Sequence, residues 1–388
     1  MAQPSSVFIV KLAGACNLNC SYCYVYNLGD TSFTARPRVM DRRVAVAAVS
    51  RIAEYAERHA LPEVRLVLHG GEPLLAGKEW MKWFLDLVYD QVAAPRIGIG
   101  IQSNGTLLDA AWVRLFGRYR VGVGISMDGL PEFHDRFRVN FAGHGSYAKV
   151  RRAIELLRDA AAPAPEWGVL VVANPECPGV EVFEHLRSLG VRRMDFLWPD
   201  YHHDAPPPWR PGVLASYFTA LFDRWYGLDD PGLEIRFFTS VIKGLMGRGT
   251  GMDALGTQPL SEVVIEADGA IEPLDVLRIC GDRFTCTGLN VLTHPLDDIA
   301  AGEVFREGLR KQELLPPQCH ACPAYETCGG GYLPHRWGQG RRFANPSVHC
   351  QDLLAVIRHV HRRVSGDLLR ARSASARARR AGAGPVAA

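Results

Sequence analysis

The stretch that decides the fold runs from Val7 to Asn27 and reads VFIVKLAGACNLNCSYCYVYN. Its first part, Val7–Leu12, is a short apolar run that is typical of a buried strand. Cys16, Cys20 and Cys23 follow at once with C-x3-C-x2-C spacing. The polar residues between the cysteines are weak helix formers. We therefore expect a loop at the end of a strand, although a helix face that packs its cysteines as small hydrophobes has the same spacing.

Three thiols in one loop indicate metal binding. Thiolate is the usual protein ligand of an iron–sulfur cluster. The next cysteine along the chain is Cys177, so the loop by itself offers three ligands to a cluster of four irons. One iron would keep an open coordination position, which is what a catalytic metal site requires.

Outward from this loop, short apolar runs alternate with longer amphipathic stretches as far as Trp198. Continuous apolar runs suit strands that are covered on both faces, as in a parallel sheet. The alternation predicts a βα-repeat fold, either a partial barrel or a doubly wound sheet. The predicted strands are Val7–Leu12, Glu63–His69, Arg96–Ser103, Val121–Met127, Gly168–Ala173 and Met194–Trp198, and the predicted helices are Asp41–His59, Gly77–Val92, Asp109–Phe116, Ser146–Ala160 and Val180–Leu189.

Composition restricts the function classes. The chain has 388 residues with 44 basic and 41 acidic side chains, a net charge of +3, which does not indicate nucleic acid as a partner. No apolar run approaches the roughly 20 residues that span a bilayer, and the N-terminus lacks the features of a signal peptide. We therefore expect a cytoplasmic protein without a membrane partner. In a reducing compartment, its 10 cysteines are expected to bind metal or do chemistry rather than form disulfides.

Prolines at Ala205–Pro211 interrupt the βα pattern, because successive prolines can neither continue a helix nor pair inside a sheet. We predict a barrel over 1–205, a helical linker over 206–260, a second domain over 261–365 and a disordered tail over 366–388. The second domain is expected to contain a hairpin, Glu262–Ile265 with Ile271–Pro273, and a closing helix, Gln351–Val364. The tail is rich in Ala, Arg, Ser and Gly, which bury too little surface to order it.

Four motifs follow the later strands in order: GGEP, QSNGT, SMDG and HDRFR. Together with the cysteine loop they resemble the radical SAM superfamily. The resemblance implies a partial (β/α)6 barrel, with a [4Fe–4S] cluster on Cys16, Cys20 and Cys23 whose open iron binds S-adenosylmethionine (SAM). Reductive cleavage of SAM would supply a 5′-deoxyadenosyl radical. The residues implied to hold SAM are Tyr22, Gly70, Gly71, Glu72, Ser103, Asn104, Ser126, Asp128 and Arg138, with the GGE residues on its amino group and Arg138 on its carboxylate.

A second cysteine group, Cys319, Cys322, Cys328 and Cys350, supplies four thiols within 32 residues. By chemistry alone it could hold zinc, or its thiols could simply be packed. The string C-x2-C-x5-C-GGGY resembles the SPASM extension of radical SAM peptide maturases, which implies an auxiliary iron–sulfur cluster. SPASM regions commonly carry two such clusters.

This chain departs from that pattern. Tyr332 and Leu274 stand where cysteines are expected, so the first auxiliary set is missing. We therefore predict one auxiliary [4Fe–4S] cluster and two clusters in total. Cys280 and Cys286 could serve a further site or be free thiols, and Cys177 is interpreted as structural. Asp275 follows the missing cysteine position, where an aspartate serves as a base in sulfatase-maturing relatives. It is our candidate general base, and capping of its own backbone is the alternative.

The details YVYN, LHGGEPLL, GGGYLPHR and FANPSVHC resemble the FxsB-like maturases, a group that forms cyclophanes in ribosomally made precursor peptides. The resemblance implies an enzyme that joins an aromatic ring carbon to the β-carbon of a residue two positions on. Its partners would be the leader and core of the precursor peptide and a reductase, flavodoxin or ferredoxin as electron donor. Because no peptide-recognition domain precedes the barrel, we expect the barrel and SPASM surfaces or a separate protein to recognise the leader.

Other functions stay open on the sequence. Within the enzymes they are sulfatase-type oxidation of a protein residue, thioether formation in a peptide, and a small-molecule radical SAM reaction. From another class, an iron–sulfur redox carrier or sensor could bind SAM without turnover. A pure electron carrier would not need the complete set of SAM contacts.

Overall fold

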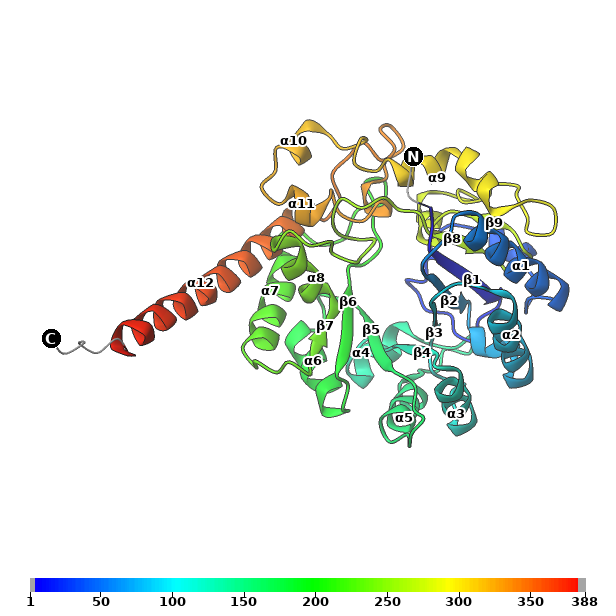
Figure 1. Ribbon diagram of the computed structural model, residues 1–388, viewed down its shortest axis with the longest axis horizontal. Helices are drawn as coiled ribbons and strands as arrows, with labels where there is room; N and C mark the ends of the chain where they lie inside the picture. Colours follow the sequence, from blue (N-terminus) through cyan, green and yellow to red (C-terminus); the bar gives the residue numbers. More distant parts are fainter. Residues whose placement is uncertain (1–3, 383–388) are drawn as a thin grey trace.

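The computed structural model describes residues 4–382, with side chains described as far as residue 371. Its centre is a curved sheet in the order β7-β6-β5-β4-β3-β2-β1-β8-β9, and the helices follow the outer side of this sheet (Figure 1). The strands are β1 Val7–Ala13, β2 Val64–Gly70, β3 Ile97–Ser103, β4 Gly122–Ser126, β5 Trp167–Val172, β6 Arg193–Leu197, β7 Glu234–Ile235, β8 Val263–Ile265 and β9 Ile271–Glu272.

The predicted βα alternation is confirmed. All six predicted strands form, and each pairs in parallel with its sequence neighbour from β1 to β6. Parallel neighbours need a crossover, which the intervening helices provide. The helices are α1 Arg42–Arg58, α2 Lys78–Gln91, α3 Ala110–Tyr119, α4 Pro131–Phe137, α5 Tyr147–Arg158, α6 Gly179–Ser188, α7 Val213–Tyr226, α8 Arg236–Leu245, α9 Glu303–Leu309, α10 Pro317–His320, α11 Tyr325–Cys328 and α12 Cys350–Gly382.

The predicted domain borders differ from the structure. The expected linker over 206–260 contributes β7 to the sheet beside β6, while α7 and α8 lie against the barrel. The expected hairpin of the second domain extends the same sheet, because β8 pairs in parallel with β1 before turning into β9. The register places Phe8 beside Val263 and Val10 beside Ile265. The barrel and the following region thus share one sheet.

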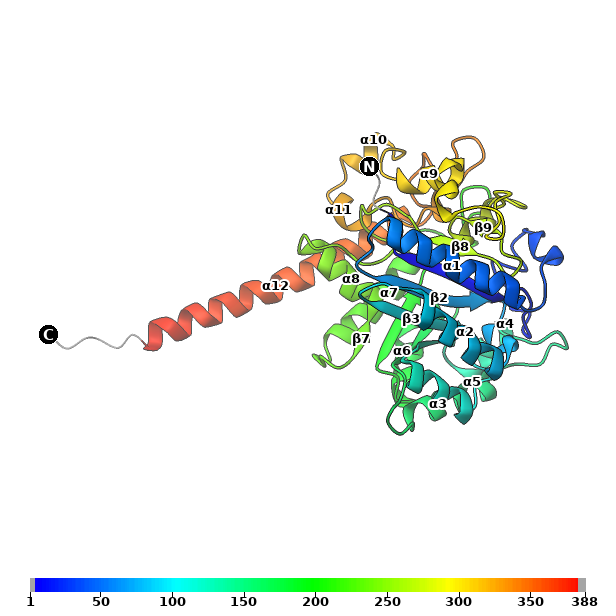
Figure 2. The same cartoon turned by 45° about the vertical axis from the view of Figure 1, so that its right-hand side comes forward.

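The last helix is longer than predicted. Helix α12 begins at Cys350 and continues to Gly382, so the expected disorder from residue 366 is wrong up to that point, and residues 383–388 lie outside the described part. Its first turns bury Leu353, Val356, Ile357 and Val360, at i, i+3, i+4 and i+7, against α7 and α8. The rest extends away from the body (Figure 2). Alanine and arginine are strong helix formers, which favours continuation of an already nucleated helix.

Between β9 and α12 the chain forms short helices that lie above the sheet in Figure 1. The second cysteine group is placed here, with Cys319 on α10, Cys322 between α10 and α11, Cys328 on α11 and Cys350 at the start of α12. Among residues 4–382, the structure contains no helix long and apolar enough to cross a membrane.

Candidate active site

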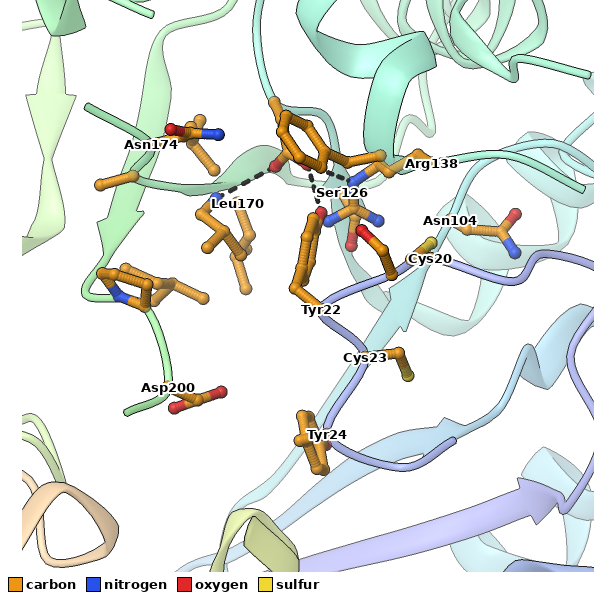
Figure 3. A pocket seen from close by; sticks show the side chains of 18 of the residues that line it. Cys20, Tyr22, Cys23, Tyr24, Asn104, Ser126, Arg138, Leu170, Asn174 and Asp200 are labelled. Carbon is orange, nitrogen blue, oxygen red and sulfur yellow. Dashed lines mark hydrogen bonds and ion pairs between the residues drawn. The ribbon is translucent and has the colours of Figure 1, made fainter. Parts of the chain in front are cut away.

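A cavity of about 490 Å³ lies at the carboxyl ends of the parallel strands. Its wall combines the cysteine loop after β1 with the loops that follow the next five strands (Figure 3). This is the end of a βα-fold where side chains from many loops converge. Of the predicted SAM-site and first-cluster residues, those that line the cavity are Cys16, Cys20, Tyr22, Cys23, Gly70, Gly71, Ser103, Asn104, Ser126, Asp128 and Arg138.

The three cysteines of the loop face this cavity as free thiols. Burial raises the pKa of Cys16 to about 12 and that of Cys20 to about 11. The Cys16 sulfur accepts hydrogen bonds from the backbone N–H of Leu18 (3.4 Å) and from Nδ2 of Asn104 (3.7 Å). Buried thiols become thiolates when a metal supplies the positive charge, and N–H donors to sulfur stabilise such a cluster. The donor set therefore fits an iron–sulfur cluster that takes three protein ligands.

In the described part of the chain, no group of three or more His, Cys, Asp or Glu side chains is close enough to hold a single metal ion. A four-iron cluster binds each cysteine to a different iron, so its ligands stand farther apart than those of one ion.

The glycines and the glutamate of the GGE motif have different roles. Gly70 and Gly71 line the cavity, and a Cβ on Gly71 would overlap the carbonyl oxygen of Ala15. Only glycine lets this backbone approach the cysteine loop so closely. The Glu72 side chain, in contrast, is fully buried and does not line the cavity.

The Glu72 carboxylate instead joins two loops. It accepts hydrogen bonds from the N–H of Leu74 (3.0 Å), the hydroxyl of Ser103 (2.9 Å) and the N–H of Asn104 (2.8 Å). Burial raises the pKa of Glu72 to about 7, although these three donors oppose the rise. The structure thus shows this carboxylate joining the loops after β2 and β3, and the contact of Glu72 with SAM stays a prediction.

Asp128, Arg138 and Tyr22 form a cluster in the cavity wall. Nε of Arg138 and the hydroxyl of Tyr22 both donate to Oδ2 of Asp128, the former at 2.8 Å (Figure 3). Oδ1 of Asp128 accepts from the N–H of Val172 at 3.1 Å. Burial alone would raise the pKa of Asp128, but Arg138 holds it below its ordinary value. The cluster fixes the guanidinium of Arg138 at the wall, where it can bind an anionic group.

Ser126 and Asn104 complete this end of the cavity. The hydroxyl of Ser126 accepts a hydrogen bond from Nε2 of Gln102 at 2.8 Å. Nδ2 of Asn104 donates to Oδ1 of Asn17 at 2.8 Å and so ties the loop after β3 to the cysteine loop. Both residues lie where the sequence places them, at the ends of neighbouring strands.

Asp275 is close to the cavity but does not line it. Its carboxylate forms a buried ion pair with Lys11 on β1 and accepts a hydrogen bond from the hydroxyl of Tyr24 at 2.7 Å. Burial would raise the pKa of Asp275, but the combined effects of Lys11, His69 and the Tyr24 hydrogen bond lower the pKa well below the usual range. Tyr24 and His69, both in the wall, stand between Asp275 and the cavity. Direct proton abstraction by Asp275 does not fit this position.

The second cysteine group lies on neighbouring short segments between α10 and the start of α12. The N–H of Cys322 donates to the carbonyl oxygen of Cys319 (3.1 Å), and the charges of Cys319, Cys322 and Cys350 each raise the pKa of Cys328 after the larger effect of burial. The four thiols are therefore near enough for their charges to affect one another, and that they hold one auxiliary cluster stays a prediction. Tyr332, in the position of the missing ligand, is half-buried and packs edge-on against the ring of His335.

The remaining cysteines are apart from this group. Cys280 is buried and Cys286 is exposed. Cys177, in the loop after β5, is also buried and lines the cavity. Sequence reasoning also missed Tyr24, His69, Asp200 and Trp209 as wall residues. His69 and Asp200 stand at or just after predicted strand ends, which is the signal that could have found them.

Comparison with known proteins agrees with this geometry. Residues 10–176 match the radical SAM superfamily. The serine-type anaerobic sulfatase-maturating enzyme of Klebsiella aerogenes is 31% identical over 380 residues, covering 94% of this chain and 88% of that protein. The cysteine-type enzyme of Clostridium perfringens (strain 13 / Type A) is 25% identical over 342 residues, covering 84% of this chain and 88% of that protein.

Solved structures with the same fold include enzymes bound to SAM and to a peptide. Native anSMEcpe with bound AdoMet superposes with a TM-score of 0.78 at 22% identity, covering 93% of this chain and 98% of that chain. Streptococcus suis SuiB bound to the precursor peptide SuiA has a TM-score of 0.53 at 16% identity, covering 90% of this chain and 76% of that chain.

Proposed function

Because this chain belongs to the radical SAM superfamily, we propose that it removes two hydrogen atoms from a peptide substrate and joins two of its side chains. It is an enzyme whose cofactors are SAM and iron–sulfur clusters. The observation that carries the proposal is the cavity, where the cysteine loop and the residues expected to hold SAM face an apolar, aromatic wall. Relatives named for the maturation of a protein, and a shared fold with a structure bound to a precursor peptide, support a peptide substrate.

Residues of this chain would hold the cofactor as follows. Cys16, Cys20 and Cys23 bind the cluster, and Arg138 binds the SAM carboxylate. The backbone at Gly70 and Gly71 faces the amino group. When bound, SAM and its cluster supply the radical that abstracts hydrogen. The aromatic wall keeps water from this radical.

The product we propose is a cyclophane in a ribosomally made precursor peptide. A hydrogen atom leaves the β-carbon of one residue, and a C–C bond forms from that carbon to the ring of an aromatic residue two positions away. The ring then loses one proton and one electron and becomes aromatic again. Phe133, Phe137, Tyr201 and Trp209 line the cavity and offer apolar surface against which a substrate ring can pack.

The proton and the electron both need acceptors. Cys319, Cys322, Cys328 and Cys350 would hold one auxiliary cluster, and such a cluster would supply an acceptor for the electron. For the proton, Tyr24 faces the cavity and donates its hydrogen bond to Asp275. Asp275 would therefore act through Tyr24, which accepts the proton as it passes its own to the carboxylate. A cytoplasmic reductase, flavodoxin or ferredoxin would supply the electron that starts each cycle.

A second candidate function is oxidation of a serine or cysteine to an aldehyde in a folded protein or an extended segment. The 31% identity to a serine-type sulfatase-maturating enzyme over 94% of this chain favours it. Serine oxidation also removes two hydrogen atoms, so mass alone does not separate the two products.

The test is anaerobic incubation of the enzyme, SAM and a reductant with two peptides. One is a short peptide encoded beside the gene that contains an aromatic-x-x motif, and the other is a serine-containing sulfatase segment. Loss of two hydrogen atoms with no fragments between the aromatic residue and the residue two positions on supports the crosslink. A product that reacts with a hydrazide shows an aldehyde and favours the second candidate. Deoxyadenosine formation with neither peptide changed contradicts both, and Cys23→Ala serves as the inactive control.

A further inference from the structure

The end of the cavity opposite Arg138 contains a carboxylate that the proposed chemistry does not use. Asp200 follows β6, its side chain is 23% exposed, and it faces the cavity across from Arg138 (Figure 3). Its Oδ1 accepts a hydrogen bond from Nε2 of His335 at 3.2 Å. In the part of the chain that the structure describes, Oδ2 of Asp200 accepts no hydrogen bond from the protein.

The charge of Asp200 is not neutralised as the other cavity carboxylates are. Asp128 is paired with Arg138, and Glu176 is paired with Arg136. Asp200 has only a histidine, and a neutral imidazole can donate its Nε2–H without cancelling the charge of the carboxylate. A carboxylate in a largely apolar wall attracts a cation strongly, because few waters screen it.

Aromatic side chains stand beside Asp200. Tyr201 and Trp209 line the same end of the cavity, with their rings perpendicular and 5.3 Å apart. Cations bind to aromatic faces, guanidinium groups more often than ammonium groups. A carboxylate with a free oxygen next to two aromatic rings is therefore suited to a guanidinium.

The loop after β6, which carries Asp200, is fixed by contacts on the side away from the cavity. Nε2 of His349 donates to the carbonyl oxygen of Pro199 at 3.0 Å, and the N–H of His203 donates to the carbonyl oxygen of Trp337 at 2.8 Å. The His335 ring packs edge-on against His349 at 5.0 Å. The loop after β6 thus rests on the segment between the second cysteine group and α12, and a preorganised carboxylate binds its ligand with less ordering cost.

We propose that Asp200, Tyr201 and Trp209 form a subsite for a cationic side chain of the peptide substrate, with arginine favoured over lysine. The proposal rests on the proposed function for the statement that the substrate is a peptide. The subsite would hold one end of the peptide, so that a residue farther along it lies near Arg138 and the cysteine loop. It is a specificity determinant and takes no part in the radical chemistry.

The first test needs no peptide substrate. Binding of Nα-acetyl-arginine amide and of its neutral isostere, Nα-acetyl-citrulline amide, is measured by anaerobic calorimetry on the cluster-loaded enzyme with SAM. We expect the arginine amide to bind about tenfold more tightly than the citrulline amide. The free energy that corresponds to this factor is close to the lower end of the range for a hydrogen bond to a charged group. Asp200→Asn should abolish the preference. Asp204→Asn is the matched control: Asp204 lies on the same loop, is exposed, and accepts a hydrogen bond from the N–H of Gln339 at 2.8 Å.

Equal binding of the two probes, or a preference that survives Asp200→Asn, would overturn the proposal. If Asp200→Asn loses iron or fails to fold, a salt titration of the native enzyme still tests the proposal. Raising sodium chloride from about 0.01 M to about 1 M shortens the screening length from about 30 Å to about 3 Å. The arginine preference should shrink over this range, and an unchanged preference contradicts a charged subsite.

The subsite and the proposed function can fail separately. If the arginine preference depends on Asp200 but no peptide is modified, the subsite stands and the peptide-crosslinking function falls. If a peptide is modified equally well with arginine or citrulline at every position, and the probes bind equally, the function stands and the subsite falls.

Discussion

The buried ion pair between Lys11 and Asp275 can separate a structural role of Asp275 from a chemical one. We consider Lys11→Met, Asp275→Asn and the double variant. The two side chains are 3% and 4% exposed, and Lys11 also lies 3.4 Å from Nδ1 of His69, which burial keeps neutral by lowering its pKa to about 4. Either single substitution leaves one charge buried without its partner.

The magnitude follows from this burial. Removing one partner of a buried ion pair costs about 3–5 kcal/mol, whereas replacing both by residues of similar volume is often neutral. At about 2 °C per kcal/mol for a large domain, each single variant should lower the unfolding midpoint by about 6–10 °C. The double variant should return close to the native midpoint, since Tyr24 can still donate to the side-chain amide oxygen that Asp275→Asn introduces. Because the pKa of Asp275 is lowered in the folded protein, its contribution is fully present above the unfolded pKa of about 3.9 and is lost only as the pH falls below it.

The assay is thermal unfolding of the cluster-loaded variants at neutral pH, followed by deoxyadenosine formation and peptide modification. A single variant as stable as the double variant would refute the ion-pair reasoning. The double variant also tests the proton route. If it is stable, cleaves SAM and still modifies peptide, then neither Asp275 nor its pairing with Lys11 is needed to accept the proton.

Three further predictions concern the loops, the second cysteine group and pH. Glu72→Gln places an amide N–H2 against a backbone N–H and should lower the free energy of unfolding by about 1–3 kcal/mol. The unfolding midpoint should fall and SAM should bind more weakly. Unchanged SAM affinity would contradict the positioning role of Glu72. Cys322→Ser should remove about four irons per chain while the exposed Cys286→Ser removes none, and iron analysis that finds equal losses would contradict the single auxiliary cluster. Burial lowers the pKa of His349 to about 3, so the unfolded chain binds more protons between that value and about 6.5. Stability should therefore fall with falling pH over this range by up to about 1.4 kcal/mol per unit, and His349→Gln should flatten the unfolding curve measured against pH.

Much of the barrel could be predicted because its signals are local. Each buried strand from β1 to β6 is a short apolar run between amphipathic stretches, and parallel pairing with both faces covered produces that pattern. The missed strand β7 has two residues, Glu234–Ile235, too few to show a period. Helix α8 did carry a signal, since Phe237, Phe238 and Val241 are buried on one face, but the neighbouring prolines suggested a linker.

The site residues could be predicted where cysteine spacing or position at a strand end defines them. They could not be predicted where a side chain's role depends on a partner far away in the sequence. The three cysteines and the glycine pair stand in the cavity because each follows a strand end. The role of Glu72 depended on donors from another loop, 31 and 32 residues away. Asp275 was chosen by its motif position, but Lys11, which sets its charge state, is 264 residues away on β1. No local pattern contains a pair of that separation.

Strand β1 explains why these distant residues meet. Its parallel pairing with β8 brings Val263–Ile265 beside Phe8–Val10, and β9 then runs back along β8, so the whole hairpin stays on the β1 side of the sheet. Lys11, one residue beyond this pairing, therefore reaches Asp275 from inside the sheet, while Tyr24 reaches it from the loop. The pair is a consequence of the sheet order, and the cysteine loop is anchored to the hairpin through Asp275 whether or not a proton ever moves there. A change that shifts the β1–β8 register by one residue would reverse the direction of Lys11 and break this anchor along with the buried face of the strand.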